Sequence, residues 1–161
     1  MSEDCDEPNQ SQGGVAFLLA QLGAHAAARF ADRVAELDLT PAQAGLLRMI
    51  AVSPGLSQQT YAARLGTPPS RFVVLVDTLQ GRNLVERRRG SPDRRSYALH
   101  LTGDGERLMG EMGAVGMAHE GDLCAALTAS ERSALRGMLA RIAEQQGLTP
   151  GVHPGYRRPA G

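Results

Sequence analysis

The chain has 161 residues, of which 42% are hydrophobic and 21% are charged, and its 17 basic residues balance its 17 acidic ones. This length and composition predict one globular domain with a substantial core and exclude a wholly disordered chain. The sequence contains neither an apolar run long enough to cross a membrane nor the pattern of an export signal, so we expect a cytoplasmic protein. Two isolated cysteines, Cys5 and Cys124, indicate neither a disulfide framework nor a metal site.

The first long helix is predicted soon after the N-terminus. Residues 1–12 are acidic and lack apolar periodicity, which predicts a disordered tail. From Gly13 to Leu37, apolar residues recur every three or four positions and predict a helix of about six turns over residues 13–38. One small lobe cannot cover the apolar stripe of so long a helix. We therefore expect this helix to take part in a homodimer.

Capping signals predict three short helices after residue 39. Thr40, with a proline after it and Gln43 three residues on, is typical of a capping box. Ser57 predicts the start of a second helix, with Ala62, Ala63 and Leu65 turned inward, that Gly66 ends. Thr67 and the proline after it predict the start of a third.

The third of these helices separates two kinds of residue onto opposite faces. Its expected inner face is apolar and comprises Phe72, Leu75, Val76 and Leu79. Its expected outer face is mostly polar and comprises Ser70, Arg71, Val74 and Thr78. The outer face is therefore free to contact a partner.

A basic β-hairpin is predicted over residues 83–102. Leu84 and Val85 open one strand, residues 96–101 alternate as a half-buried second strand, and residues 90–93 form the loop between them. Five arginines flank this loop: Arg87, Arg88, Arg89, Arg94 and Arg95. Such a tip favours an anionic partner, although an ordinary solvated hairpin has the same pattern.

The two helices around Gly66 and the hairpin together predict a winged helix-turn-helix over about residues 40–102. The second helix of the pair is of a width to enter the DNA major groove with its N-terminal side chains toward base edges, and the hairpin would reach the flanking backbone or the minor groove. Winged helices also serve as protein-interaction modules, so that alternative stays open.

Two further helices are predicted over residues 103–147. Thr102 caps the first, whose many glycines make it dependent on packing against another surface. Thr128 and Glu131 form a capping box at the start of the second. The expected fold is mainly α, of the α+β type, with the long N- and C-terminal helices forming a dimerisation domain. Residues 148–161, rich in proline and glycine, predict a flexible tail.

Several motifs resemble the multiple antibiotic resistance regulator (MarR) family. They are Leu39-Thr40-Pro41-Ala42-Gln43, Ser57-Gln58-Gln59, Val76-Asp77-Thr78-Leu79, Leu84-Val85-Glu86-Arg87, and Asp93-Arg94-Arg95 with Leu101-Thr102 after it. The similarity covers residues 13–147. It implies a homodimeric regulator of double-stranded DNA, usually a repressor, that a small, often phenolic ligand or the oxidation of a cysteine releases from a pseudo-palindromic operator. The surroundings of Cys5 and Cys124 do not favour oxidant sensing.

The resemblance and the helix faces together give the expected DNA contacts. They are Ser57, Gln58, Thr67, Ser70, Arg71 and Val74 on the helices, and Arg88, Arg89, Asp93, Arg94 and Arg95 on the wing. The resemblance implies that Asp93 braces Arg95, which enters the minor groove, while Arg94 contacts phosphate. Val74 departs from the family, which often has a basic residue there, so a phosphate contact is missing or replaced by an apolar contact with a thymine methyl group. Asn83 replaces the usual glycine and tolerates a left-handed turn.

An effector site is expected where the first, second and fifth helices meet, as the resemblance implies. The candidate polar contacts are His25, Arg29 and Tyr61, and the candidate apolar walls are Met49 and Met112. A helical His-Arg pair is more often a simple surface feature. No spacing typical of a metal site, a catalytic triad or a phosphate loop is present, so we expect no metal, no cofactor and no enzymatic activity. We expect the protein to be associated with the nucleoid. Two alternatives to a ligand-responsive regulator stay open: a ligand-blind DNA-binding protein and a winged-helix protein-interaction module.

Overall fold

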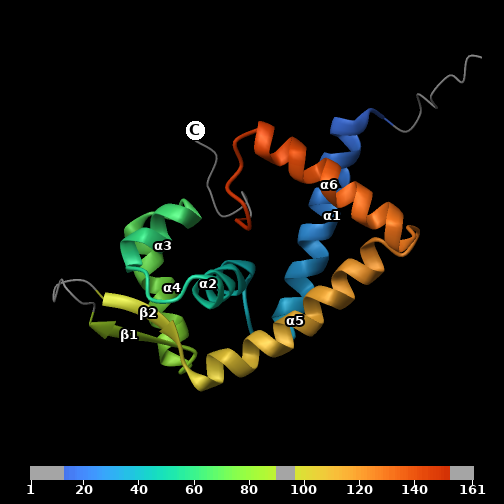
Figure 1. Ribbon diagram of the computed structural model, residues 1–161. Coiled ribbons are helices and arrows are strands. Elements are labelled where there is room, and N and C mark those ends of the chain that lie inside the picture. Colours follow the sequence, from blue (N-terminus) through green and yellow to red (C-terminus); the bar gives the residue numbers. More distant parts are fainter. Residues whose placement is uncertain (1–12, 90–96, 153–161) are drawn as a thin grey trace, which may run out of the picture.

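The computed structural model describes residues 13–89 and 97–152. Its elements in chain order are α1 (Val15–Ala35), α2 (Pro41–Val52), α3 (Gln58–Leu65), α4 (Pro69–Gly81), β1 (Val85–Arg89), β2 (Tyr97–Leu101), α5 (Gly103–Leu123) and α6 (Ala129–Gln145). Figure 1 shows α2, α3, α4 and the hairpin gathered at one end and α1 and α6 toward the other, with α5 running from the hairpin to α6. This arrangement confirms the predicted fold, a mainly helical winged helix-turn-helix with long helices on both sides of it in sequence.

The predicted capping residues set most of the helix boundaries. At the start of α2, the backbone N–H of Thr40 donates to Gln43 Oε1 at 2.8 Å, and the N–H of Gln43 donates to Thr40 Oγ1 at 3.3 Å. Gly66 ends α3 in the left-handed conformation, with φ of 61°. The start of α4 differs from the prediction, because this helix follows Pro68 and has no side-chain cap. Thr67 therefore does not cap it.

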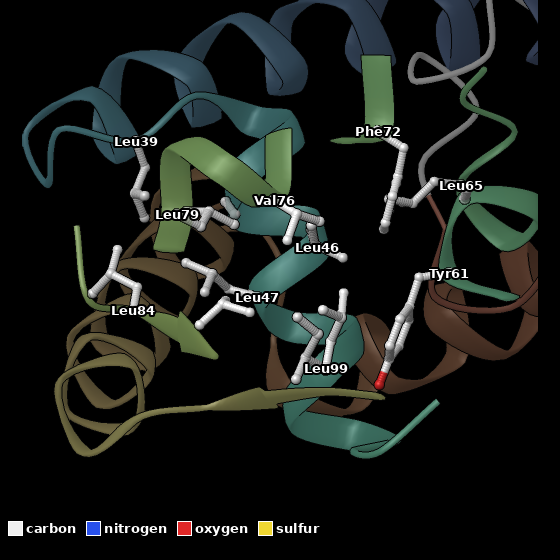
Figure 2. Packing of buried hydrophobic residues seen from close by; sticks show 14 of the residues in the cluster. Leu39, Leu46, Leu47, Tyr61, Leu65, Phe72, Val76, Leu79, Leu84 and Leu99 are labelled. Carbon is white, nitrogen blue, oxygen red and sulfur yellow. The ribbon is translucent and has the colours of Figure 1, made fainter. Parts of the chain in front are cut away.

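The core lies where α2 meets α4 and the hairpin. Figure 2 shows Leu46 and Leu47 of α2 among Val76 and Leu79 of α4 and Leu99 of β2, and all five side chains are fully buried. Burying one side chain of this size stabilises a fold by about 1.5–3 kcal/mol. The inner face of α4 is thereby fixed against α2, and its opposite face is held toward solvent.

Tyr61 is a core residue without exposed surface. Its hydroxyl donates to the carbonyl oxygen of Ser53 and accepts a bond from the N–H of Leu56 at 3.3 Å, which ties the loop between α2 and α3 to α3. Burial raises the pKa of this phenol, so it remains a neutral donor. The prediction that Ala63 faces inward was wrong, since Ala63 is exposed and the larger ring of Tyr61 fills the core instead.

The hairpin is tied to α5 around Asn83. Strand β1 pairs antiparallel with β2 from Val85 opposite Leu101 to Arg89 opposite Tyr97. Asn83 has a φ of 57°, which confirms the predicted left-handed turn. Its backbone carbonyl accepts a bond from the Thr102 hydroxyl. The wing and the first turn of α5 therefore form one joint.

Within residues 13–89 and 97–152, no helix combines the length and the apolar character needed to cross a membrane.

Candidate nucleic-acid interface and effector cleft

The outer face of α4 is exposed and lies opposite the core. Ser70, Arg71, Val74 and Thr78 are all exposed there, and Val74 has 63% of its surface open to solvent. Residues four positions apart lie above one another on a helix, so Ser70, Val74 and Thr78 form one ridge. A shallow depression runs beside this ridge, toward Gln43 of α2. The face offers one cation, two hydroxyl groups and one apolar side chain to a partner.

The wing begins beside α4, where Arg88 and Arg89 are exposed at the end of β1. The guanidinium of Arg88 pairs with the carboxylate of Glu86, and its Nε lies 2.7 Å from Oε1. Arg89 follows it toward the hairpin tip. The predicted wing contacts Asp93, Arg94 and Arg95 lie outside the described residues.

Arg87 fastens the wing to both helices of the helix-turn-helix. Its Nε donates to Gln58 Oε1 of α3 at 2.5 Å, and its Nη2 donates to Asp77 Oδ1 of α4 at 2.5 Å. Its Nη1 donates to Gln80 Oε1 of α4. The Arg87 side chain is only 20% exposed. A planar guanidinium with several donors fits such a set of acceptors, so Arg87 sets how the wing lies against α4.

Three residues predicted to contact DNA lie at the ends of α3 and not on the outer face of α4. Ser57 and Gln58 are at its start, and Thr67 comes just after its end. Ser57 caps α3, and its hydroxyl also bonds Thr60 Oγ1 at 2.8 Å. Gln58 is half-buried and engaged with Arg87. Thr67 is half-buried after Gly66, with its N–H bound to the carbonyl of Ala62 at 3.0 Å. Their DNA contacts stay predictions. The role of Arg87 was missed because no local pattern marks an arginine that bridges three elements.

Two of the predicted effector residues lie together between α1 and α5. His25 and Arg29 line a depression of about 170 Å³, whose other walls are Arg33, His119, Asp122 and Leu123. Arg33 of α1 pairs with Asp122 of α5, which holds the two helices together here. The depression carries two arginines and two histidines against one carboxylate. The two guanidinium groups outnumber the single carboxylate, which suits an anionic ligand. Of these lining residues, the sequence predicted only His25 and Arg29.

His119 sits at the wall of this depression, with its ring centre 5.8 Å from that of Phe30. Partial burial lowers the pKa of its imidazole, and the positive charges of Arg33 and Arg29 lower it further. The imidazole is therefore held in its neutral form more firmly than a free histidine is. It can accept or donate one hydrogen bond without adding charge to the cleft.

The other three predicted effector residues are not brought to this depression. Met49 lines a separate hollow of about 250 Å³, with Arg48, Arg64 and residues 149–152 among its walls. Met112 packs against the core from α5. Tyr61 has no exposed surface and both of its hydroxyl bonds are internal. This packing does not support a ligand contact of Tyr61.

Large apolar side chains remain exposed on the helices that flank the winged part. On α1, the exposed fractions are 70% for Val15, 58% for Phe17 and 53% for Leu22. On α6, they are 52% for Met138 and 40% for Ile142, and this helix buries no residue at all within the described chain. Large exposed apolar side chains on a helix are typical of an interaction site, because monomeric proteins rarely expose a large apolar patch to water.

Among the described residues, no group of histidine, cysteine and acidic side chains is placed to hold a metal ion. Cys124 is free and half-buried at the end of α5. Cys5 lies outside the described residues.

Comparison with known proteins identifies the family. Residues 37–96 match the model of the MarR family. A putative transcriptional regulatory protein for the hcr operon of Thauera aromatica is 35% identical over 112 residues, which make up 70% of this chain and 68% of that protein. The chain belongs to the MarR family. The sequence resemblance is thereby confirmed, and this MarR protein is a transcriptional regulator and not an enzyme, as predicted.

Solved structures of MarR-family proteins match most of the chain. The transcriptional repressor CouR, bound to a 23-mer DNA duplex, is 33% identical with a TM-score of 0.72, over 85% of this chain and 97% of that one. The Mycobacterium tuberculosis MarR family protein Rv2887 in complex with DNA is 26% identical with a TM-score of 0.69. The match covers 80% of this chain and 97% of that one. The same protein in complex with p-aminosalicylic acid has a TM-score of 0.66 at 26% identity, over 81% of this chain and 98% of that one.

Proposed function

We propose that this MarR protein is a homodimeric repressor that binds a pseudo-palindromic operator in double-stranded DNA and releases it when a small aromatic acid binds. The observation that carries the proposal is the outer face of α4, where Ser70, Arg71 and Val74 are exposed opposite a fully buried face. An α-helix fits the major groove, and its exposed side chains then meet base edges. CouR and Rv2887, both solved with DNA, support this reading.

The wing supplies the second contact with DNA. Arg88 and Arg89 are exposed beside α4, and arginines in such a position neutralise phosphates or enter the minor groove. Within the proposed wing, Asp93 braces Arg95 for the minor groove and Arg94 contacts phosphate. The contacts with phosphate fix the register of the protein, while those of α4 with base edges give the sequence preference.

A second copy of the chain covers the exposed apolar faces of α1 and α6. These faces expose large apolar side chains, and both helices lie away from α3 and α4 in Figure 1. A two-fold dimer places its recognition helices in half-sites about 10 base pairs apart, one turn of DNA. The operator is therefore pseudo-palindromic, and the dimer resides on the nucleoid.

The effector occupies the depression between α1 and α5. Arg29 and His25 meet the carboxylate of an aromatic acid there, and the p-aminosalicylic acid complex of Rv2887 supports this ligand class. A ligand acts only through unequal affinity for the DNA-spaced dimer and the other arrangement. A tenfold loss of operator affinity needs about 1.4 kcal/mol of such inequality. The junction of α1 with α5 is where this difference arises.

The DNA-binding part is tested with the full-length protein and a pool of random duplexes. We expect the retained fragments to share one short palindrome that a footprint shows as protected, with a dimer found by light scattering. Arg71→Ala should weaken operator binding by about 1–3 kcal/mol and relax the preferred sequence. Arg107→Ala, a control whose guanidinium pairs with Asp104 within α5, should leave both unchanged. Retention without a common sequence would point to a ligand-blind DNA-binding protein, and no retention to a protein-interaction module.

The effector part is tested by titrating p-aminosalicylate into the operator complex. We expect release of the DNA, and a weaker response in Arg29→Ala and His25→Ala. The control ligand is 3-aminophenol, which keeps the substituted ring and lacks the carboxylate, so it should act poorly. If neither p-aminosalicylate nor other salicylate-like acids bind, the protein is a constitutive repressor and the ligand-gated part of the proposal is wrong.

A further inference from the structure

Val74 stands out on the recognition face because it is apolar and exposed. It occupies the middle of the outer face of α4, between Ser70 and Thr78 on the same ridge, with 63% of its surface in solvent. A β-branched residue also lowers the stability of an exposed helix slightly relative to a straight-chain residue. Neither packing within the chain nor helix propensity accounts for a valine here. On this face, the exposed valine is available for contact with an apolar group of a partner.

The surroundings of Val74 extend this apolar surface. The hydroxyl of Thr78 donates to the carbonyl oxygen of Val74 at 2.9 Å, so its hydrogen bond is used within the helix and its methyl group remains for outside contacts. Half-buried Leu75 lies on the neighbouring side, toward the shallow depression that Gln43 of α2 borders. Arg71 stands at the edge of the same depression. The result is a small apolar surface with a guanidinium beside it.

One chemical group in the major groove matches such a surface. Of the groups that base pairs present there, only the C5 methyl of thymine is apolar, and cytosine carries a hydrogen at the same position. Arginine pairs with O6 and N7 of guanine in the same groove. A pyrimidine methyl beside a guanine therefore complements Val74 and Arg71 together.

We propose that Val74 and the methyl group of Thr78 form a binding site for the C5 methyl group of one pyrimidine in each operator half-site. This inference rests on the proposed DNA-binding function and specifies what the recognition helix reads. It makes Val74 a specificity-determining residue that distinguishes thymine from cytosine by a methyl group. 5-Methylcytosine carries the same methyl group at C5. When guanine stands opposite it in the duplex, it should therefore replace thymine in this contact.

The test replaces single thymines of the selected operator by deoxyuridine, which pairs identically and lacks only the methyl group. Binding of each duplex is measured for the full-length wild-type protein, for Val74→Ala, and for Val73→Ala as a control on the flank of α4. Losing one buried methyl should weaken binding roughly fourfold per half-site, and about fifteenfold when both half-sites are changed. Thermal unfolding of each variant verifies that it remains folded.

The expected result is one thymine per half-site whose replacement weakens the wild type and Val73→Ala but not Val74→Ala. Equal losses in the wild type and Val74→Ala would assign the methyl effect to DNA shape or to another side chain and overturn the proposal. Insensitivity of the wild type to every deoxyuridine would overturn it as well, with sequence-specific binding intact. Failure to select any operator would instead refute the proposed function on which the inference rests.

Discussion

Gly105→Ala should destabilise the protein although it adds only a methyl group to a helix. A Cβ atom at this position would overlap the carbonyl oxygen of Leu84, and would lie 3.1 Å from the carbonyl carbon of Leu84 and 3.4 Å from Cβ of Leu101. The Leu84 oxygen already accepts a bond from the N–H of Thr102 at 3.1 Å. Since the obstacle is buried backbone that joins the wing to α5, neither side can yield without breaking this joint.

The magnitude follows from two opposing effects. Overpacking of a buried site costs about 1–3 kcal/mol, whereas replacing a helical glycine by alanine gains about 0.5–1 kcal/mol. Gly110→Ala is the matched control on α5, because a Cβ there meets nothing within 4 Å in this chain and only the gain remains. Because the gain from alanine is common to both variants, they should differ by the overpacking cost of roughly 1–3 kcal/mol, which is a difference of about 2–12 °C in Tm.

The assay is urea or thermal unfolding at one fixed protein concentration, because the stability of a dimer depends on concentration. Gly105→Ala should unfold before the wild type, and Gly110→Ala at or after it. Equal midpoints for the two variants would refute the reasoning, since the close approach of α5 to Leu84 would then carry no cost.

Three further predictions concern single side chains. Tyr61→Phe should lower the free energy of unfolding by about 1–3 kcal/mol, because two backbone groups lose their buried partner, and an unchanged denaturation midpoint would contradict this. Arg87→Lys keeps the charge but cannot bridge Gln58, Asp77 and Gln80, so operator affinity should fall about tenfold in a binding titration while Arg107→Lys leaves it unchanged. His119 has a lowered pKa in the folded chain, so the unfolded chain binds its proton more tightly. Stability should therefore be highest above pH of about 6.5 and fall as the pH drops below that value, and His119→Gln should reduce this fall when unfolding is followed across pH.

Local patterns in the sequence determined most of the secondary structure of the described chain. The capping boxes at Thr40 and Thr128, the end of α3 at Gly66 and the left-handed turn at Asn83 were all predicted and are all present. Each depends on residues within about one turn of one another, so the chain carries the signal wherever the element lies in space. The inner and outer faces of α4 were equally predictable, since helical periodicity alone separates them.

Only the tertiary structure decided which residues meet across elements. Arg87 reaches Gln58 from 29 positions away, and Gly105 lies against the backbone of Leu84, across a hairpin. His119 joins His25 and Arg29 in one depression, whereas Tyr61 turns into the core. Such contacts depend on how rigid helices are placed relative to one another, and periodicity gives the face of each helix without giving its neighbour. A pattern of apolar residues therefore predicted the surface that α4 presents, while packing alone selected the guanidinium that holds the wing against it.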